Sequence, residues 1–320
     1  MNRREALLKL LRLGGLGAGT VVLGAWLNQR SQRPVDAVVV EAKRSHAVRS
    51  NTTLPEMVVV TGGEPAQLVQ AAIRELGGMG RFVARGDVVL LKPNIGWDRT
   101  PEQAANTNPE LVAEVIRQCR QAGAGRVIVT DVSCNDPRRC FRRSGIAAAA
   151  EREGAEVVLP DPDNFKEVDI HGTVLRNWPV FAPFLSADKI INLPIAKHHS
   201  LTGATLGMKN WYGMLGGQRN QLHQQVHESL ADLADFIRPT LTMLDAYRVL
   251  IRNGPTGGSL EDVVLKKTMV AGTDPVAIDA YVAKAYWNLD ADALPYLGFA
   301  SKKGLGTLEF DKVRSKVVNL

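Results

Sequence analysis

Residues 108–131 read NPELVAEVIRQCRQAGAGRVIVTD, a stretch that joins a capped helix to a short apolar strand. Asn108 is a good N-cap and Pro109 suits the first helical turn, so a helix is predicted to about Gln121, where a glycine-containing turn follows. Residues 126–131 are continuously apolar up to their polar end, as expected of a strand that is buried on both faces. The segment therefore predicts one helix–strand unit of a parallel sheet.

The same alternation of strands and helices continues on both sides of this segment. Strands are expected at residues 57–61, 87–91, 126–131, 156–159, 189–193, 241–245 and 263–271, and helices at residues 64–76, 108–121, 139–152, 221–237, 275–287 and 292–301, with a hairpin at 167–181. This order predicts an α/β fold with a mixed, mainly parallel sheet flanked by helices. Residues 54–320 contain no internal repeat or linker, and we expect a single domain there.

Composition limits the classes of function. The chain has 320 residues, of which 45% are hydrophobic and 22% charged, so a sizeable core is expected. The net charge of +6 is partly carried by the first 33 residues, and no basic run is interleaved with aromatic residues. This pattern argues against nucleic-acid binding and suits an anionic ligand. Three cysteines are too few for a disulfide framework, although a single Cys134–Cys140 bridge and plain thiols both stay open. The cysteines also lack ferredoxin spacing, so no iron–sulfur cluster is expected.

Residues 1–30 form a basic and then mildly apolar leader. The run from Asn2 to Lys9, which contains Arg3 and Arg4, resembles the twin-arginine export signal. The resemblance implies the twin-arginine translocation machinery as a partner and a location in the periplasm or on the outer face of the cytoplasmic membrane, with membrane contact only through an uncleaved leader. An amphipathic helix or a membrane anchor is the alternative, and residues 31–53 have the polar character of a linker.

The segment with the most chemical content is residues 190–210, IINLPIAKHHSLTGATLGMKN, where a buried strand runs into a polar loop. In open α/β sheets, ligands bind beyond the carboxyl ends of the strands. Lys197 and Lys209 would supply positive charge, while His198 and His199 offer proton transfer or metal ligation. Further candidate ligand-binding side chains in the segment are Asn192, Thr202 and Asn210. A basic surface loop with solvated histidines is the alternative.

Polar residues also end or follow other predicted strands. Lys92 and Asn94 follow the strand at 87–91, Asp131 ends the strand at 126–131 and is expected to line the same crevice, and Asp245 ends the strand at 241–245. Such strand-end groups are typical ligand or base positions, although a structural capping role is equally open for Asp245. Asn253 is a further candidate, in a glycine-rich loop. His223 lies four residues before His227 on a predicted helix, so the two side chains share a face of that helix. This face would either supply a metal ligand or be an exposed polar face.

The order and spacing of several motifs resemble the bacterial and archaeal family known as domain of unknown function 362. The motifs are LKPN at 91–94, NTNP at 106–109, KHH at 197–199 with GMKN at 207–210, MLD at 243–245, NGP at 253–255 and GTDPVAID at 272–279. Members of that family often carry twin-arginine leaders, and some add an iron–sulfur module whose cysteines this chain lacks. The character of the His/Gly/Lys loop also resembles the catalytic domain of nickel-cofactor lactate racemases, which implies proton or hydride chemistry at a hydroxy acid.

Together these patterns predict an exported protein with a small-anion or metal site, and two functions stay open. In an enzyme, the catalytic groups would be His198, His199, Lys209 and Asp245, and the ligand-binding groups Lys92, Asn94, Asn192, Lys197, Thr202, Asn210 and Asn253. A divalent metal, if present, would take His198, His199 and His223. The alternative is a non-catalytic periplasmic protein that binds metal or ligand, or that assists the assembly of a redox enzyme.

Overall fold

A ten-stranded sheet organises the structure, a computed structural model that describes residues 45–49 and 51–320. The expected leader lies outside the described residues, as do residues 31–44 and residue 50 of the expected linker. The main path of the sheet is β12-β1-β11-β10-β7-β2-β3-β4, with β8 paired to β10 and β9 paired to β8. Only β9 and β11 run antiparallel to their neighbours, which confirms the predicted mixed, mainly parallel sheet.

The strands of this sheet are β1 (Met57–Thr61), β2 (Val88–Pro93), β3 (Arg126–Val129), β4 (Glu156–Val157), β7 (Lys189–Leu193), β8 (Ile195–His199), β9 (Gly203–Thr205), β10 (Leu241–Leu250), β11 (Val263–Gly272) and β12 (Ser315–Asn319). The predicted hairpin is present as the separate antiparallel pair β5 (Phe165–Asp169) and β6 (Asn177–Phe181). The helices are α2 (Pro65–Glu75), α3 (Pro109–Gln121), α4 (Pro137–Arg143), α5 (Ile146–Arg152), α6 (Pro183–Ser186), α7 (Val226–Ile237), α8 (Pro275–Trp287) and α9 (Pro295–Lys302).

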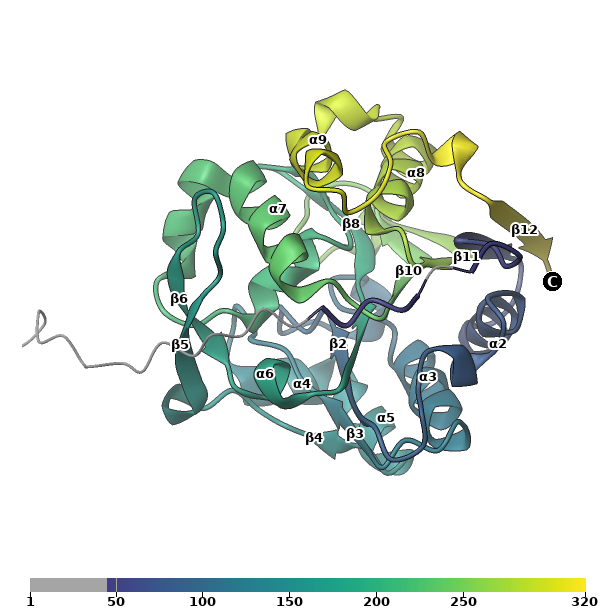
Figure 1. Cartoon of the computed structure of the whole chain (residues 1–320), viewed down its shortest axis with the longest axis horizontal. Helices are drawn as coiled ribbons and strands as arrows, with labels where there is room; N and C mark the ends of the chain where they lie inside the picture. The colour runs from purple at the N-terminus through teal and green to yellow at the C-terminus, as the bar shows by residue number, and fades with distance from the viewer. Residues whose placement is uncertain (1–44, 50) are drawn as a thin grey trace, which may run out of the picture. The chain divides into compact units, whose positions relative to one another are not determined.

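Helices cover the sheet on both faces, and each face has its own hydrophobic core. Successive strand residues alternate between the two cores: in β1, Met57 and Val59 join the core under α7, α8 and α9, whereas Val58 and Val60 join the core under α2, α3 and α5. Figure 1 shows the two groups of helices on opposite sides of the strands. Burial on both faces explains why these strands read as apolar runs in the sequence.

Local sequence signals set several helix ends. The Asn108 side chain accepts a hydrogen bond from the backbone N–H of Glu110 (3.0 Å), as its N-cap position predicted. The single helix predicted at 139–152 is two helices, because Gly145 adopts φ 74° between α4 and α5. The helix predicted at 221–237 begins only at Val226 and is preceded by a 3-10 turn at Arg219–Gln225.

The polar loop expected after β7 is a β-hairpin made of β8 and β9. In the register of this hairpin Lys197 lies opposite Thr205, and β8 also pairs with the extended end of β10. Because successive side chains of a strand point to opposite faces, the hairpin separates residues that are neighbours in the sequence. Within the described part of the chain, no helix is both long enough and apolar enough to span a bilayer.

Candidate functional site

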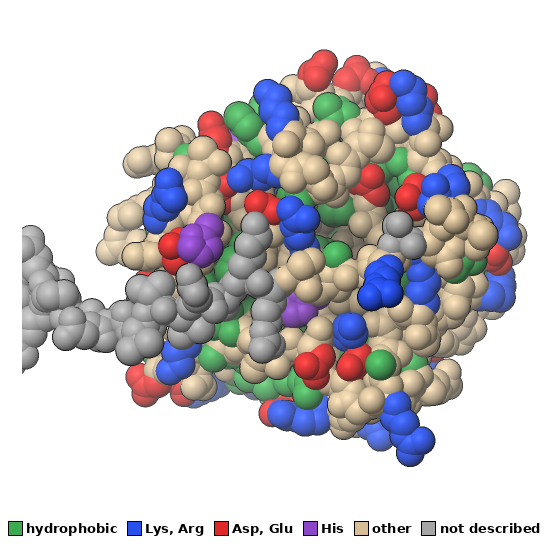
Figure 2. Space-filling view, viewed as in Figure 1, with side chains coloured by type: hydrophobic (Ala, Val, Ile, Leu, Met, Phe, Trp, Pro, Cys, Tyr) green, Lys and Arg blue, Asp and Glu red, His purple; other side chains and the backbone are tan. Residues whose placement is uncertain are grey.

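A cavity of about 480 Å³ lies beyond the carboxyl ends of β2 and β3, beside the β8–β9 hairpin. Its walls come from the segments after β2 and β3, from β8, from the 3-10 turns at Lys209–Met214 and Arg219–Gln225, and from the loop at residues 255–256. This is the position at which ligands bind in open α/β sheets. On the face drawn in Figure 2, lysine and arginine side chains are scattered among acidic ones.

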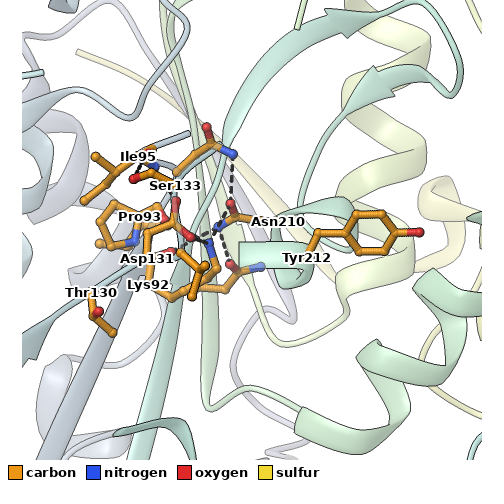
Figure 3. A network of polar contacts seen from close by, with 12 residues as sticks. Lys92, Pro93, Ile95, Thr130, Asp131, Ser133, Asn210 and Tyr212 are labelled. Carbon is orange, nitrogen blue, oxygen red and sulfur yellow. Dashed lines mark hydrogen bonds and ion pairs between the residues drawn. The ribbon is translucent and has the colours of Figure 1, made fainter. Parts of the chain in front are cut away.

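A buried ion pair forms the floor of the cavity. The Lys92 ammonium donates to Asp131 Oδ1 at 2.5 Å, and the second carboxylate oxygen of Asp131 accepts from the backbone N–H of Ile95 at 2.6 Å. Figure 3 shows the two side chains meeting where β2 and β3 end. Burial lowers the pKa of Lys92 even though Asp131 opposes that shift. The pair is therefore charge-balanced and costly to break.

Asn210 connects this pair to the rest of the cavity. Its side-chain N–H groups donate to the Lys92 carbonyl (3.0 Å) and to Asn192 Oδ1 (2.8 Å), while its Oδ1 accepts from the Lys92 ammonium (3.1 Å) and from Asn94 Nδ2 (3.0 Å). Every polar atom of the Asn210 side chain has a partner, so the orientation of its amide is fixed. The orientation of Asn94 follows, because only its oxygen is left to accept a hydrogen bond.

Lys197 uses that oxygen. Its Nζ donates to Asn94 Oδ1 (2.9 Å) and to the Ala105 carbonyl (2.6 Å), and its side chain is buried. Among the described residues, no carboxylate is paired with it. Burial, together with the nearby positive charges of Lys209 and Lys92, lowers the pKa of Lys197 to about 7.

Lys209 is the second buried lysine without an acidic partner. Within the described residues its ammonium makes no hydrogen bond or ion pair, and lies 4.9 Å from the centre of the Tyr212 ring. Burial and the charge of Arg219 lower its pKa to about 8. The turn that carries it is held by the buried Asp279 carboxylate, which accepts from the backbone N–H groups of residues 207 (2.7 Å) and 208 (3.0 Å).

The cavity therefore carries more positive than negative charge. Its lining contains four cationic side chains, Lys92, Lys197, Lys209 and Arg219, against one carboxylate, Asp131. Arg219 donates to three backbone carbonyls and to the Cys134 sulfur at 3.7 Å. The three lysines are buried and Arg219 is half-buried, and this excess of cations over carboxylates favours an anion in the space between them.

His199 enters the same cavity as a neutral imidazole. Its Nδ1 accepts the backbone N–H of Leu201 at 3.1 Å, which places the ring proton on Nε2. Burial and the charges of Lys209 and Lys197 lower its pKa to about 3. With Nε2 protonated and Nδ1 occupied, His199 is arranged to donate a hydrogen bond rather than to ligate a metal or to take up a proton.

His198, unlike its neighbour His199, does not line the cavity. The side chain of His198 projects from the other face of β8, lies outside the cavity lining, and accepts the backbone N–H of Gly254 through Nδ1 at 3.2 Å. His223 does line the cavity, edge-on to Tyr212 at 5.8 Å, whereas His227 stacks on Tyr296. Among the described residues, no three His, Cys, Asp or Glu side chains are grouped so that they could hold a metal ion. The three histidines suggested as metal ligands are thus not brought together.

The predicted site residues fall into three groups. The cavity lining contains Lys92, Asn94, Lys197, His199, Lys209, Asn210 and His223. Asn192 lies one layer behind it, holding Asn210 and the Gly207 carbonyl. Asp245, Thr202 and Asn253 lie outside the lining and have structural contacts instead.

Those contacts explain why three polar residues of the motifs do not reach the cavity. Both Asp245 oxygens accept backbone N–H groups, from Asn108 (2.8 Å) and from residue 247 (2.9 Å), and burial raises the pKa of Asp245 to about 6. Thr202 donates to the Ala204 carbonyl (3.1 Å). Asn253 donates to a carboxylate oxygen of Asp262 (2.9 Å) and so fixes its own loop.

Sequence reasoning did not single out Arg219 and Tyr212, which also line the cavity. Both belong to 3-10 turns that have no clear hydrophobic period, so the pattern gave no sign that they face inward. Cys134 also lies at the cavity, and all three cysteines are free thiols in the structure. The bridge between Cys134 and Cys140 is not formed.

Fold and site together define an α/β protein with a cationic cavity at the carboxyl edge of its sheet. The chain belongs to the family described as Domain of unknown function (DUF362), whose model matches residues 89–284. A relative of similar length is a thylakoid-associated protein of Synechocystis sp., which is 27% identical over 252 residues and matched over 74% of each chain.

Two solved structures share a distant likeness with this chain. One is a lactate racemase apoprotein from Thermoanaerobacterium thermosaccharolyticum, with a TM-score of 0.40, 12% identity and coverage of 72% of this chain. The other is a protein from Thermotoga maritima, with a TM-score of 0.37, 11% identity and coverage of 74%. The match spans 58% of the length of each of these two proteins.

Proposed function

We propose that this protein binds a small organic anion, bearing a carboxylate or phosphate group, in the cationic cavity and acts on it by acid–base chemistry. The observation that carries the proposal is the largely buried Lys209 side chain, whose ammonium lines the cavity and has no hydrogen-bond acceptor or acidic partner among the described residues. An ammonium that is largely removed from bulk water is stabilised by an anion beside it. An incoming carboxylate or phosphate would meet that need.

Acid–base chemistry is supported by the protonation states of the groups that surround the bound anion. A lysine with a pKa of about 8 exchanges protons readily near neutral pH, which suits Lys209 as the acid–base group. His199, neutral and protonated on Nε2, would hold a carbonyl or enolate oxygen of the ligand. In this assignment His199 stabilises negative charge and does not accept the proton itself.

The binding step is tested by calorimetry with lactate, succinate, glycerol phosphate and inorganic phosphate. A Lys209→Met variant should bind the preferred anion at least about ten-fold more weakly, a loss of about 1.4 kcal/mol, whereas Lys209→Arg retains the charge and most of the affinity. Lys166→Met, which removes an exposed lysine from β5, is the matched control and should bind normally. Equal binding by Lys209→Met and the native chain would contradict the proposal.

The catalytic step is tested separately, by following exchange of carbon-bound hydrogen into deuterated water with the anion that binds. His199→Leu should bind the anion but lose exchange, because leucine has no N–H group to hold the carbonyl or enolate oxygen. Binding without exchange in the native chain would favour a non-catalytic ligand-binding protein. Normal complementation in cells by the Lys209→Met variant would favour an assembly role through surface contacts.

We further propose that the protein is exported through the twin-arginine pathway to the periplasm or the outer face of the cytoplasmic membrane. The Arg3-Arg4 pair before an apolar, glycine-rich stretch supports this proposal. Cell fractionation of the native chain and an Arg3→Lys/Arg4→Lys variant provides the test. The variant should accumulate in the cytoplasm, and an unchanged distribution would favour an amphipathic helix or an anchor inserted by another route.

A further inference from the structure

We propose that Lys197 is a nucleophilic amine that forms an imine with the carbonyl carbon of a 2-oxo acid bound in the cavity. The inference rests on the proposed function, because it names the class of anion that the cavity takes. It is carried by a contrast between two lysines that are buried to the same degree in the same cavity.

The contrast lies in their partners. The Lys92 ammonium has a carboxylate at 2.5 Å and a carbonyl and an amide oxygen at 3.1 Å, which is the environment of a charged group. Lys197 has two acceptors, an amide oxygen at 2.9 Å and a backbone carbonyl at 2.6 Å, and both are neutral. Two acceptors match the two N–H bonds of a neutral amine, which has a lone pair in its remaining position. A neutral lysine amine is the form that attacks carbonyl carbons.

The neutral environment of Lys197 is imposed by the network behind it. Asn94 presents its oxygen to Lys197 because its Nδ2 is bonded to Asn210 Oδ1, and Asn210 is itself oriented by Lys92 and Asn192. Asn94 is therefore a positioning residue: it holds the amine in place without giving it a counter-charge. The charges of Lys209 and Lys92 act in the same direction, and at the resulting pKa of about 7 a large fraction of Lys197 is free amine at neutral pH.

The other groups of the cavity select the substrate class. Lys209 remains free to pair with a carboxylate, and His199 presents an Nε2–H that can hold the carbonyl oxygen. A carboxylate and a carbonyl within reach of one amine describe a 2-oxo acid. The cavity volume of about 480 Å³ falls in the range of small-molecule sites, so the acid can carry a side chain of several carbon atoms.

The step balances without an oxidant or reductant. The Nζ lone pair forms a bond to the carbonyl carbon, the electron pair of the C=O π bond moves to oxygen, and one proton passes from the nitrogen to that oxygen. The carbinolamine hydroxyl then takes a second proton from solvent and leaves as water while the nitrogen lone pair forms the C=N bond, so that a protonated imine remains. Hydrolysis by water reverses the sequence and returns the free lysine.

The test is reductive trapping on the full chain. The protein is incubated with pyruvate or 2-oxoglutarate, treated with sodium cyanoborohydride and analysed by intact mass and peptide mapping. We expect one reduced adduct per chain, with labelling of Lys197 at least about ten-fold above any other lysine at neutral pH. Lys197→Met should abolish the adduct, while Lys166→Met should leave it unchanged.

A second variant keeps the test independent of folding defects. Asn94→Asp preserves shape and retains Lys197, but it gives the amine an acidic partner at hydrogen-bond distance. The pH midpoint of labelling should therefore rise by more than about one unit, since an opposite charge at this distance raises a lysine pKa by that amount or more. An unchanged midpoint would show that the labelled amine does not lie beside residue 94, which would contradict the assignment to Lys197.

Two outcomes would overturn the imine proposal while leaving the proposed function intact. One is binding of pyruvate by calorimetry without any reduced adduct, and the other is an adduct on Lys209 or spread over surface lysines. If calorimetry detects no carboxylate or phosphate binding at all, the proposed function itself is wrong and the imine proposal fails with it.

Discussion

The buried pair of Lys92 and Asp131 gives the sharpest prediction about stability. The change is Asp131→Asn, which keeps the size of the side chain and removes its charge. The Lys92 ammonium would retain two neutral acceptors, the Pro93 carbonyl and Asn210 Oδ1, but would lose its counter-ion in a fully buried site. An uncompensated buried charge is among the most unfavourable changes that a core can suffer.

Two limits set the expected loss of unfolding free energy in Asp131→Asn. Breaking a buried pair by removing one partner costs about 3–5 kcal/mol of unfolding free energy. The lysine can limit the loss by releasing its proton, and neutralising an ordinary lysine at pH 7 costs about 4–5 kcal/mol. We therefore expect Asp131→Asn to lose about 3–5 kcal/mol, a large part of the total of about 5–15 kcal/mol that is usual for a domain.

The assay is urea unfolding at pH 7 followed by circular dichroism, with Lys92→Met and the double variant completing a cycle. The double variant should be more stable than the sum of the single losses predicts, by at least about 1 kcal/mol, because it leaves no charge unpaired. Glu156→Gln, which breaks the exposed pair with Arg126, is the control and should cost about 0–1 kcal/mol. If Asp131→Asn loses less than about 1 kcal/mol and the single variants are additive, Lys92 and Asp131 do not stabilise each other as a buried ion pair.

Three further outcomes follow from the same structure. Burial lowers the pKa of His199 to about 3, so the unfolded chain takes up a proton at this residue before the folded chain does as the pH falls. The free energy of unfolding should therefore fall between about pH 6.5 and pH 3, by up to about 1.4 kcal/mol per pH unit more steeply than in His199→Gln. Parallel pH profiles of the two chains in urea titrations would contradict this. In Gly213→Ala the added Cβ would lie within 3 Å of both Lys92 and Asp131. We therefore expect a loss of about 1–3 kcal/mol of unfolding free energy and weaker anion binding. A fully stable variant would show that the floor of the cavity is not tightly packed. Iodoacetamide should alkylate only Cys134 in the folded protein, because the other two thiols are buried and burial raises their pKa values. Modification of a second cysteine in the peptide map would be inconsistent with the structure.

The sequence patterns predicted the elements that have strong local signals. Asn108 and Pro109 marked the start of α3, and the apolar runs at β2, β3 and β7 indicated strands that are buried on both faces. The family motifs also predicted that their polar residues lie at one edge of the sheet, because the residues that follow parallel strands gather there. Lys92, Asn94, Lys197 and Lys209 were singled out in this way, and all four line the cavity.

Patterns were least informative where an element is short or lies at an edge of the sheet. The edge strand β12 was not expected, and the hairpin of β8 and β9 was taken for a loop. Each of these elements has five or fewer residues, too few for a clear hydrophobic period. β12 pairs with β1, which is far from it in the chain, whereas β8 and β9 pair with each other across a short turn. The 3-10 turn that carries Arg219 also has no clear hydrophobic period.

Local sequence patterns predict the α/β class, the order of the main strands and helices, and the set of cationic and amide side chains near one sheet edge. Which of these side chains meet depends on the folded chain. Strand geometry turns His198 away from His199 although the two are adjacent, and hydrogen bonds to backbone N–H groups withdraw Asp245 from the cavity. The pairing of Lys92 with Asp131, which leaves Lys197 with neutral partners only, depends on contacts between residues 39 and 103 positions apart. Charge and hydrogen-bond partners act over a few ångströms in space, and the folded chain sets those distances.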